Sequence, residues 1–159
     1  MNVAKARVLV TGGSSGIGKA TALALAELGA RVAICGRDAA SITRAAGEIG
    51  ATPFVADVSK EADVVALIPQ VVKALGGYDA LINNAGFGRF APLIETTADD
   101  MRAVWETNVL GATLAARESA KHFIKQSYGN IVNVASTSAA HGSANGSAYS
   151  SSKLALASH

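Results

Sequence analysis

Short apolar runs along this chain are separated by longer segments with a helical pattern. The runs predict strands, and none of them alternates polar with apolar residues as a strand with one solvated face would. Strands that are buried on both faces are typical of parallel sheets covered by helices. The five predicted strands are residues 6–11, 31–35, 51–56, 78–82 and 129–135.

Helices are predicted between these strands. Asp38 and Thr97 stand where a side chain caps a helix N-terminus, and Gly29 stands where a glycine ends a helix. These signals frame segments rich in Ala, Leu and Val, which suit helices packed closely on a sheet. The predicted helices are residues 17–28, 39–49, 59–75 and 98–126, and a last one from about residue 147.

Four irregularities are expected. Pro69 predicts a kink or a break in its helix, because a mid-helix proline removes a hydrogen bond. The helix from residue 98 is expected to bend as it passes Asn108. Residues 136–146 are predicted to form a loop of small residues, and the last helix is expected to be still running at His159.

The alternation of strands and helices predicts a doubly wound α/β fold. Right-handed crossovers leave few topologies, and the nucleotide-binding strand order 3-2-1-4-5 of a Rossmann-like parallel sheet fits best. The chain shows no linker, internal repeat or low-complexity tract. We therefore expect one domain over residues 1–159.

Composition narrows the function. The chain has 159 residues, of which 50% are hydrophobic and 16% charged, so a packed core is expected and disorder is not. The net charge of +2 comes from scattered basic residues, which disfavours nucleic-acid or membrane-surface partners. Cys35 is the single cysteine, so no intrachain disulfide is expected. With no signal peptide in residues 1–7 and no membrane-length apolar run, we expect a cytoplasmic protein.

The turn from Thr11 to Gly18 (T-G-G-S-S-G-I-G) lies between the first strand and the first helix. Its glycines let the backbone turn sharply and approach a pyrophosphate at a helix N-terminus. The spacing differs from G-x-G-x-x-G, and a Gly/Ser-rich loop without function is the alternative, but the flanking strand and helix favour a phosphate cradle. The cofactor-binding residues predicted in this turn are Gly12, Ser14, Ser15, Gly16, Ile17 and Gly18.

The end of the second strand bears on which dinucleotide binds. An acid at this position would bind a ribose 2′-hydroxyl, whereas an arginine would accommodate a 2′-phosphate. Gly36 stands where the acid is usually found, and Arg37 follows it. We therefore predict that Arg37 contacts the 2′-phosphate of NADP, with NAD the less favoured cofactor. A solvated Arg37 is the alternative.

Two further strand ends carry candidate cofactor contacts. Asp57 and Val58 follow the third strand, where they either contact an adenine or only begin the next helix. Asn84, Ala85 and Gly86 follow the fourth strand, where small residues admit a ligand and amides can tie strand ends together. An ordinary Asn/Gly turn is the alternative there. The nearby Phe87, Phe90 and Pro92 either line a substrate channel or lie on a surface loop.

Four residues form a candidate reacting set. Tyr149 and Lys153 are four residues apart on the last helix and so share one face. A tyrosine ordinarily has a pKa near 10, so acid/base work near neutrality needs a neighbouring cation that favours the phenolate. Ser136 could hydrogen-bond a substrate oxygen, and Asn108 could hold a water that links Lys153 to solvent. Tyr-x-x-x-Lys alone is a weak motif, and the order of the whole set strengthens it.

Taken in order along the chain, these motifs resemble those of the short-chain dehydrogenase/reductase family, and Arg37 resembles its NADP-preferring carbonyl or 3-oxoacyl reductase-like branch. The resemblance implies a nicotinamide cofactor and interconversion of a carbonyl and an alcohol. By this resemblance, Tyr149 is the general acid/base and Ser136 orients the substrate. Lys153 lowers the pKa of the tyrosine and holds the nicotinamide ribose, and Asn108 completes a proton relay. It also implies a homo-oligomer formed through the helices that contain Asn108 and Tyr149.

The resemblance has a consequence for length. Family members usually run to about 250 residues, so a chain of 159 residues is expected to lack the family's C-terminal strands. The alternative function is therefore a catalytically incompetent dinucleotide-binding fragment of such an enzyme. A related sugar-nucleotide epimerase is less favoured, because the spacing of the Thr11 turn and the loop at residues 83–86 resemble the reductases more. The substrate itself cannot be read from the sequence.

Overall fold

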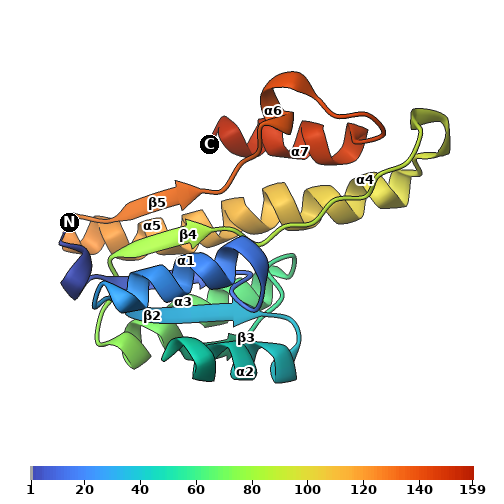
Figure 1. The fold of residues 1–159 in the computed structure, drawn as a ribbon. Coiled ribbons are helices and arrows are strands. Elements are labelled where there is room, and N and C mark those ends of the chain that lie inside the picture. Colours follow the sequence, from blue (N-terminus) through green and yellow to red (C-terminus); the bar gives the residue numbers. More distant parts are fainter. Residues whose placement is uncertain (1) are drawn as a thin grey trace.

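A five-stranded parallel sheet forms the centre of the molecule in the computed structural model, which describes residues 2–159 (Figure 1). The strand order β3-β2-β1-β4-β5 confirms the predicted topology. All four neighbouring pairs are parallel, so the carboxyl ends of the strands meet at one edge. The strands are β1 (Arg7–Thr11), β2 (Arg31–Gly36), β3 (Thr52–Val55), β4 (Ala80–Asn83) and β5 (Asn130–Asn133).

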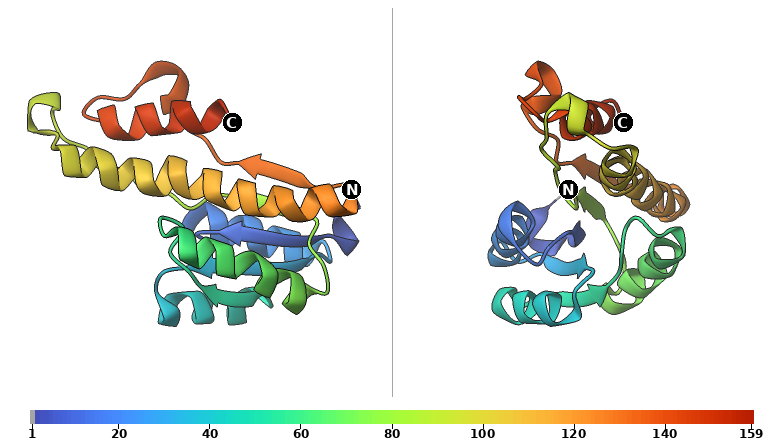
Figure 2. Two further views of the ribbon diagram at one scale, coloured as in Figure 1. Left: turned by 180° about the vertical axis from the view of Figure 1, so that it is seen from behind. Right: turned by 90° about the vertical axis from the view of Figure 1, so that its right-hand side faces the viewer.

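Helices cover both faces of this sheet (Figure 2). Helices α1 and α2 pack on one face, whereas α3 and α5 pack on the other. Helices α6 and α7 lie beyond the carboxyl edge near β5 (Figure 1). The α-helices are α1 (Gly16–Glu27), α2 (Ala39–Ile49), α3 (Glu61–Leu75), α4 (Ala98–Trp105), α5 (Ala112–Gln126), α6 (Ser138–His141) and α7 (Ser147–Ala157); the 3-10 helices are η1 (Val3–Lys5) and η2 (Leu93–Glu95), and η3 (Glu106–Gly111) is a π-helix.

The core has two layers because the strands are apolar on both faces. Leu9 of β1 belongs to the cluster with α3 and α5, whereas Val8 and Val10 belong to the cluster with α1 and α2. All three side chains are fully buried. Edge strand β5 differs, since Ile131 and Val132 keep 40% and 49% of their surface exposed.

Local capping explains where several elements begin and end. The Asp38 carboxylate accepts a hydrogen bond from the Ser41 N–H at 2.7 Å and so begins α2. Thr97 and Asp100 bond each other reciprocally at the start of α4 in a capping box. Gly76 ends α3 in the left-handed conformation that glycine adopts without strain. The predicted caps at Asp38 and Thr97 are therefore confirmed.

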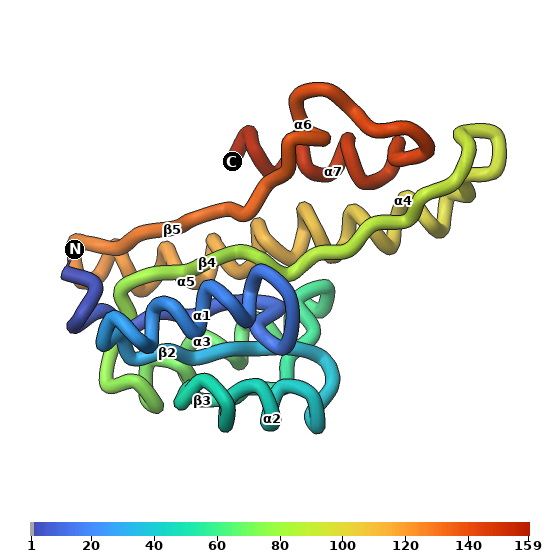
Figure 3. Tube along the Cα trace, viewed as in Figure 1, coloured from blue at the N-terminus to red at the C-terminus, as the bar shows by residue number. Residues whose placement is uncertain are grey.

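Helices α4 and α5 form one long rod that is interrupted only by the π-helix η3. Residues 84–97 run outward beside this rod and return at its far end (Figure 3). The π-helix contains Asn108 and is the point where the regular α-helical ladder changes. It lies where the sequence predicted a bend.

Three expectations differ from the structure. Of the kink or break expected at Pro69, the break is absent, because Pro69 lies inside one continuous helix α3. The segment at residues 136–146 is not only loop, because it contains the single helical turn α6. The last helix does not run to His159; it ends at Ala157, and Ser158 is its C-cap. Within residues 2–159, no helix has the length and apolarity needed to cross a membrane.

Candidate functional site

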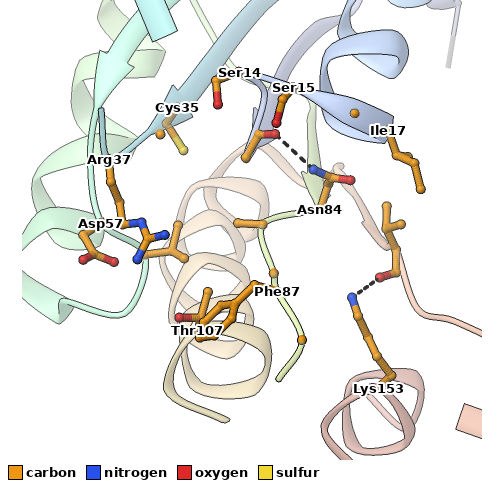
Figure 4. Close-up of a pocket in the computed structure, with 18 of the residues that line it drawn as sticks. Ser14, Ser15, Ile17, Cys35, Arg37, Asp57, Asn84, Phe87, Thr107 and Lys153 are labelled. Atoms are coloured by element: carbon orange, nitrogen blue, oxygen red, sulfur yellow. Dashed lines mark hydrogen bonds between the residues drawn. The ribbon is translucent and has the colours of Figure 1, made fainter. Parts of the chain in front are cut away.

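A pocket of about 650 Å³ runs along the carboxyl edge of the sheet (Figure 4). Each of the five strands contributes residues from its end, and α7 closes one side. The lining residues are Gly12, Ser14, Ser15, Gly16, Ile17, Cys35, Gly36, Arg37, Ala56, Asp57, Val58, Asn84, Ala85, Gly86, Phe87, Gly88, Phe90, Thr107, Val134, Ala135, Tyr149 and Lys153.

The Gly-rich turn is packed against the end of β4. Gly12 has a φ of +66°, and a Cβ there would lie 2.8 Å from Ala85 Cα. A Cβ on Gly18 would lie 2.3 Å from Asn84 Nδ2. Side chains at these two positions are therefore excluded by conformation or by space, which explains the glycines.

Hydrogen bonds fasten the same two segments together. Asn84 Nδ2 donates to Thr11 O at 3.0 Å and to Gly12 O at 3.2 Å. Thr11 Oγ1 accepts the N–H groups of Asn84 and Ala85, each at 3.0 Å. The turn and the β4 end thus form one pre-built corner of the pocket.

The N-terminus of α1 opens onto this corner. The side chain of its N-cap residue, Ser15, makes no capping hydrogen bond, and the first turn contains no acidic residue. In contrast, α3 carries Glu61 and Asp63 in its first turn. Helix N-terminal N–H groups attract anions, so the start of α1 suits a phosphate group.

Arg37 and Asp57 come from the side of the pocket formed by β2 and β3 (Figure 4). Arg37 is exposed, and within residues 2–159 it belongs to no ion pair. Asp57 Oδ1 accepts hydrogen bonds from the Ser59 N–H and Oγ, at 3.1 and 2.7 Å. Asp57 thus serves the turn before α3 and lines the pocket as well.

Helix α7 brings Tyr149 and Lys153 to the opposite end of the pocket. Lys153 is only 4% exposed, and its Nζ donates to Val134 O at 2.7 Å, which Figure 4 shows as a dashed line. The same Nζ lies 5.9 Å from the centre of the Tyr149 ring. Burial lowers the pKa of Lys153, because the charged ammonium loses solvation. No hydrogen bond from the described residues occupies the Tyr149 hydroxyl.

Asn108 is fully buried and does not line the pocket. Its Oδ1 accepts from the Phe87 N–H at 3.0 Å, and its Nδ2 donates to Phe87 O and to Ser152 Oγ, both at 2.9 Å. Ser152 Oγ in turn donates to Tyr149 O at 2.7 Å. Asn108 therefore joins the loop after β4 to the helix that carries Tyr149.

Ser136 lies in the loop after β5 and is partly buried. Its Oγ accepts the Ser138 N–H at 3.1 Å, at the start of α6. It does not line the pocket, and it does not hydrogen-bond Tyr149.

The structure brings most of the predicted site residues into one pocket, whereas Gly18, Asn108 and Ser136 lie just outside its lining. Sequence reasoning did not propose the lining residues Cys35, Ala56, Gly88, Thr107, Val134 and Ala135, and it considered Gly36 only as the position of an absent acid. Two of these could have been found, because Val134 and Ala135 follow β5 just as Asn84 and Ala85 follow β4. No group of three or more metal-ligating side chains gathers anywhere in residues 2–159.

Comparisons with known proteins give relatives that are similar in sequence and in fold. Residues 6–159 match the family model described as short chain dehydrogenase. A 3-oxoacyl-[acyl-carrier-protein] reductase of Bos taurus is 40% identical over 92% of this chain, and an L-fucose dehydrogenase of Rattus norvegicus is 37% identical over 94%. The match spans 63% and 56% of these relatives' own lengths. A crystal structure of NAD⁺-bound xylitol dehydrogenase superposes with a TM-score of 0.92 at 38% identity, covering 98% of this chain and 62% of that one.

Proposed function

The chain belongs to the short-chain dehydrogenase family, and on this premise we propose that it carries an NADP-dependent oxidoreductase site for a carbonyl or secondary alcohol substrate. One observation carries the proposal. A single pocket is lined at one end by the Gly-rich turn and at the other by Tyr149 and Lys153. A dinucleotide lying along the carboxyl edge of the sheet would reach both ends.

The residues present fit such a cofactor. No side chain caps the start of α1, whose first residues Gly16 and Ile17 line the pocket, so its N–H groups would hold the pyrophosphate. Arg37 would hold the 2′-phosphate, since Gly36 supplies no acid to repel it. The bovine relative is a reductase and the xylitol dehydrogenase holds NAD⁺, so NAD is the alternative cofactor.

When bound, the nicotinamide ring of NADPH supplies the hydride that adds to the carbonyl carbon. Tyr149 would donate its hydroxyl proton to the carbonyl oxygen, which completes the alcohol. The negative charge left on the Tyr149 oxygen would be stabilised by the Lys153 ammonium nearby, until a proton from solvent restores the hydroxyl. The reverse direction uses the same groups with Tyr149 as the base.

Ser136 and Asn108 would support this step. The Ser136 Oγ lies outside the pocket lining and accepts one backbone N–H, and its own hydrogen would be left for a substrate oxygen. The Asn108 side chain has both amide hydrogens engaged, so its main contribution would be to hold Phe87 and α7 in position. A water relay at Asn108 stays a prediction.

The proposal is tested by replacing Tyr149 with Phe. Tyr149→Phe is expected to lower the rate of NADPH oxidation with a ketone panel by about 10²–10⁴-fold, because the proton donor is lost. NADPH affinity, measured by fluorescence titration, is expected to stay within about threefold, because the ring is kept.

Tyr128→Phe is the matched control. It removes a hydroxyl that donates a hydrogen bond to Asp79 and that lies far from the pocket. It is expected to leave turnover intact. Turnover that survives Tyr149→Phe would remove Tyr149 from the mechanism. NADPH binding by the wild type without turnover of any ketone would favour the dinucleotide-binding fragment instead.

A further inference from the structure

The segment Phe87–Ala91 forms one wall of the pocket and is fixed at both ends. At its start, the Phe87 backbone is held on both sides by the buried Asn108 amide, at 3.0 and 2.9 Å. At its end, the Ala91 N–H donates to Asn145 O at 2.9 Å. This wall is therefore held in place by the protein itself.

Phe90 turns back from this wall onto Tyr149. The two ring centres lie 5.6 Å apart with planes tilted by 48°, which is a favourable aromatic contact. Gly88 makes the approach possible, because a Cβ there would lie 2.6 Å from Phe90 Cε2 and 3.2 Å from Tyr149 Cδ2. The Phe90 and Tyr149 rings thus meet beside Gly88, which has no side chain to keep them apart.

The Phe90 ring is also available to a ligand. It lines the pocket and keeps 61% of its surface exposed. An exposed phenyl group beside the proposed proton donor offers an apolar face and no hydrogen-bonding group. A flat apolar substituent could cover that face favourably, whereas a hydroxyl placed there would lose water without gaining a partner.

We propose that Phe90 is a specificity-determining residue that selects carbonyl substrates carrying a flat apolar ring within a few bonds of the carbonyl carbon over polyhydroxylated ketoses. The inference rests on the proposed function, because it takes Tyr149 as the group that meets the carbonyl oxygen. The substituent would lie against the Phe90 ring while the carbonyl oxygen points to the Tyr149 hydroxyl.

Binding of two ketones tests this without requiring turnover. The probes are 2-tetralone, whose ketone ring is fused to an aryl ring, and xylulose, a polyhydroxylated ketone. Their dissociation constants are measured by ligand-observed NMR with and without NADP⁺, which cannot supply a hydride. The wild type is expected to bind 2-tetralone at least about tenfold more tightly than xylulose.

Phe90→Asn is expected to reduce this preference about tenfold by weakening 2-tetralone binding, and Phe90→Leu to reduce it less, because apolar area is kept. Ile94→Asn is the matched control, since Ile94 lies close by in the 3-10 helix η2, is 95% exposed and does not line the pocket. It is expected to leave the preference unchanged. Circular dichroism checks that each variant is folded. If Phe90→Asn does not fold, the comparison of Phe90→Leu with the wild type is the test.

Equal preference in the wild type and the Phe90 variants, or no ketone binding by the wild type, would overturn the inference. The proposed function fails separately. If 2-tetralone preference follows Phe90 while no hydride transfer occurs from NADPH, the binding role of Phe90 stands and the oxidoreductase proposal falls. If turnover occurs with equal preference for both ketones, the oxidoreductase proposal stands and Phe90 loses its role.

Discussion

Arg37 is the residue that we propose distinguishes NADP from NAD, through the 2′-phosphate that only NADP carries. Its guanidinium is exposed at the pocket, next to a glycine at the end of β2. A 2′-phosphate there would gain a charge-assisted contact that a 2′-hydroxyl would not. An acidic side chain would have the opposite preference.

Arg37→Asp is therefore expected to lower the ratio of NADPH to NADH affinity by at least about tenfold, which is about 1.4 kcal/mol. Fluorescence titration with each dinucleotide measures the ratio. Arg44→Asp makes the same charge change at an exposed residue of α2 that does not line the pocket, and should leave the ratio unaltered. An unchanged ratio of NADPH to NADH affinity in Arg37→Asp would contradict the proposed contact between Arg37 and the 2′-phosphate.

Gly18 illustrates what residue type alone tells about a site. The turn pattern marked it as a cofactor-binding residue, and a glycine is indeed required there. The structure gives the requirement a packing cause, since a Cβ would meet the Asn84 amide and Gly12 O at 2.3 and 2.4 Å. A motif identifies the position, but only the fold distinguishes contact with a ligand from contact with a neighbouring strand.

At the scale of elements, the long rod of α4, η3 and α5 depends on a small buried network. Its π-helix carries Asn108, whose amide reaches both the loop after β4 and α7. Ser152 is the member on α7, and it is fully buried. The network sets how α7, and with it Tyr149, sits against the rod.

Ser152→Ala is expected to destabilise the protein by about 1–2 kcal/mol, because Asn108 Nδ2 loses one of its two acceptors in a buried site. Urea unfolding measures the loss. Ser158→Ala removes an exposed hydroxyl whose hydrogen bond is to its own helix, and should change stability by less than about 0.5 kcal/mol. Equal effects in both variants would contradict a structural role for the network.

The order of elements was predictable because apolar runs, caps and turn glycines agree along the chain. Details that depend on tertiary contacts were not. Pro69 was expected to kink or break α3, and the helix is not broken there. No residue type encodes the π-turn around Asn108, and α6 is too short to show a period. The hydrogen bond from Asn108 to Ser152 joins residues that are 44 positions apart, so no spacing in the sequence could reveal it.

At the scale of the whole molecule, a second polar network holds the edge of the sheet opposite the pocket. Arg7 donates to both carboxylate oxygens of Asp79, at 2.8 and 2.6 Å, and to Tyr128 Oη at 2.9 Å. The Tyr128 hydroxyl donates to Asp79 at 2.6 Å. The network joins the start of β1 to the approaches to β4 and β5. Hydrogen bonds from the Arg7 guanidinium lower the pKa of Asp79 to about 2.

A carboxyl group whose pKa is lower in the folded protein than in the unfolded chain stabilises the folded state at any pH above its unfolded pKa. This stabilisation is lost as the pH falls from the unfolded pKa to the folded pKa. For Asp79 this window runs from 3.8 down to about 2, which corresponds to about 2 kcal/mol. Asp79→Asn should therefore cost about 2 kcal/mol at pH 7, and its difference from the wild type should shrink between pH 4 and pH 2 in urea unfolding. Asp99→Asn, at a 92% exposed side chain, should show neither effect. A pH-independent cost at Asp79 would refute the charge-based explanation.

The pocket draws on the ends of all five strands, from Gly12 after β1 to Ala135 after β5. No single loop forms this pocket, so the pocket is present only when all the strands and their connections are folded. A ligand that binds there binds the folded chain and not the unfolded one, so its binding adds to the free energy of global unfolding by mass action. Ligand binding and folding of this sheet are therefore linked equilibria.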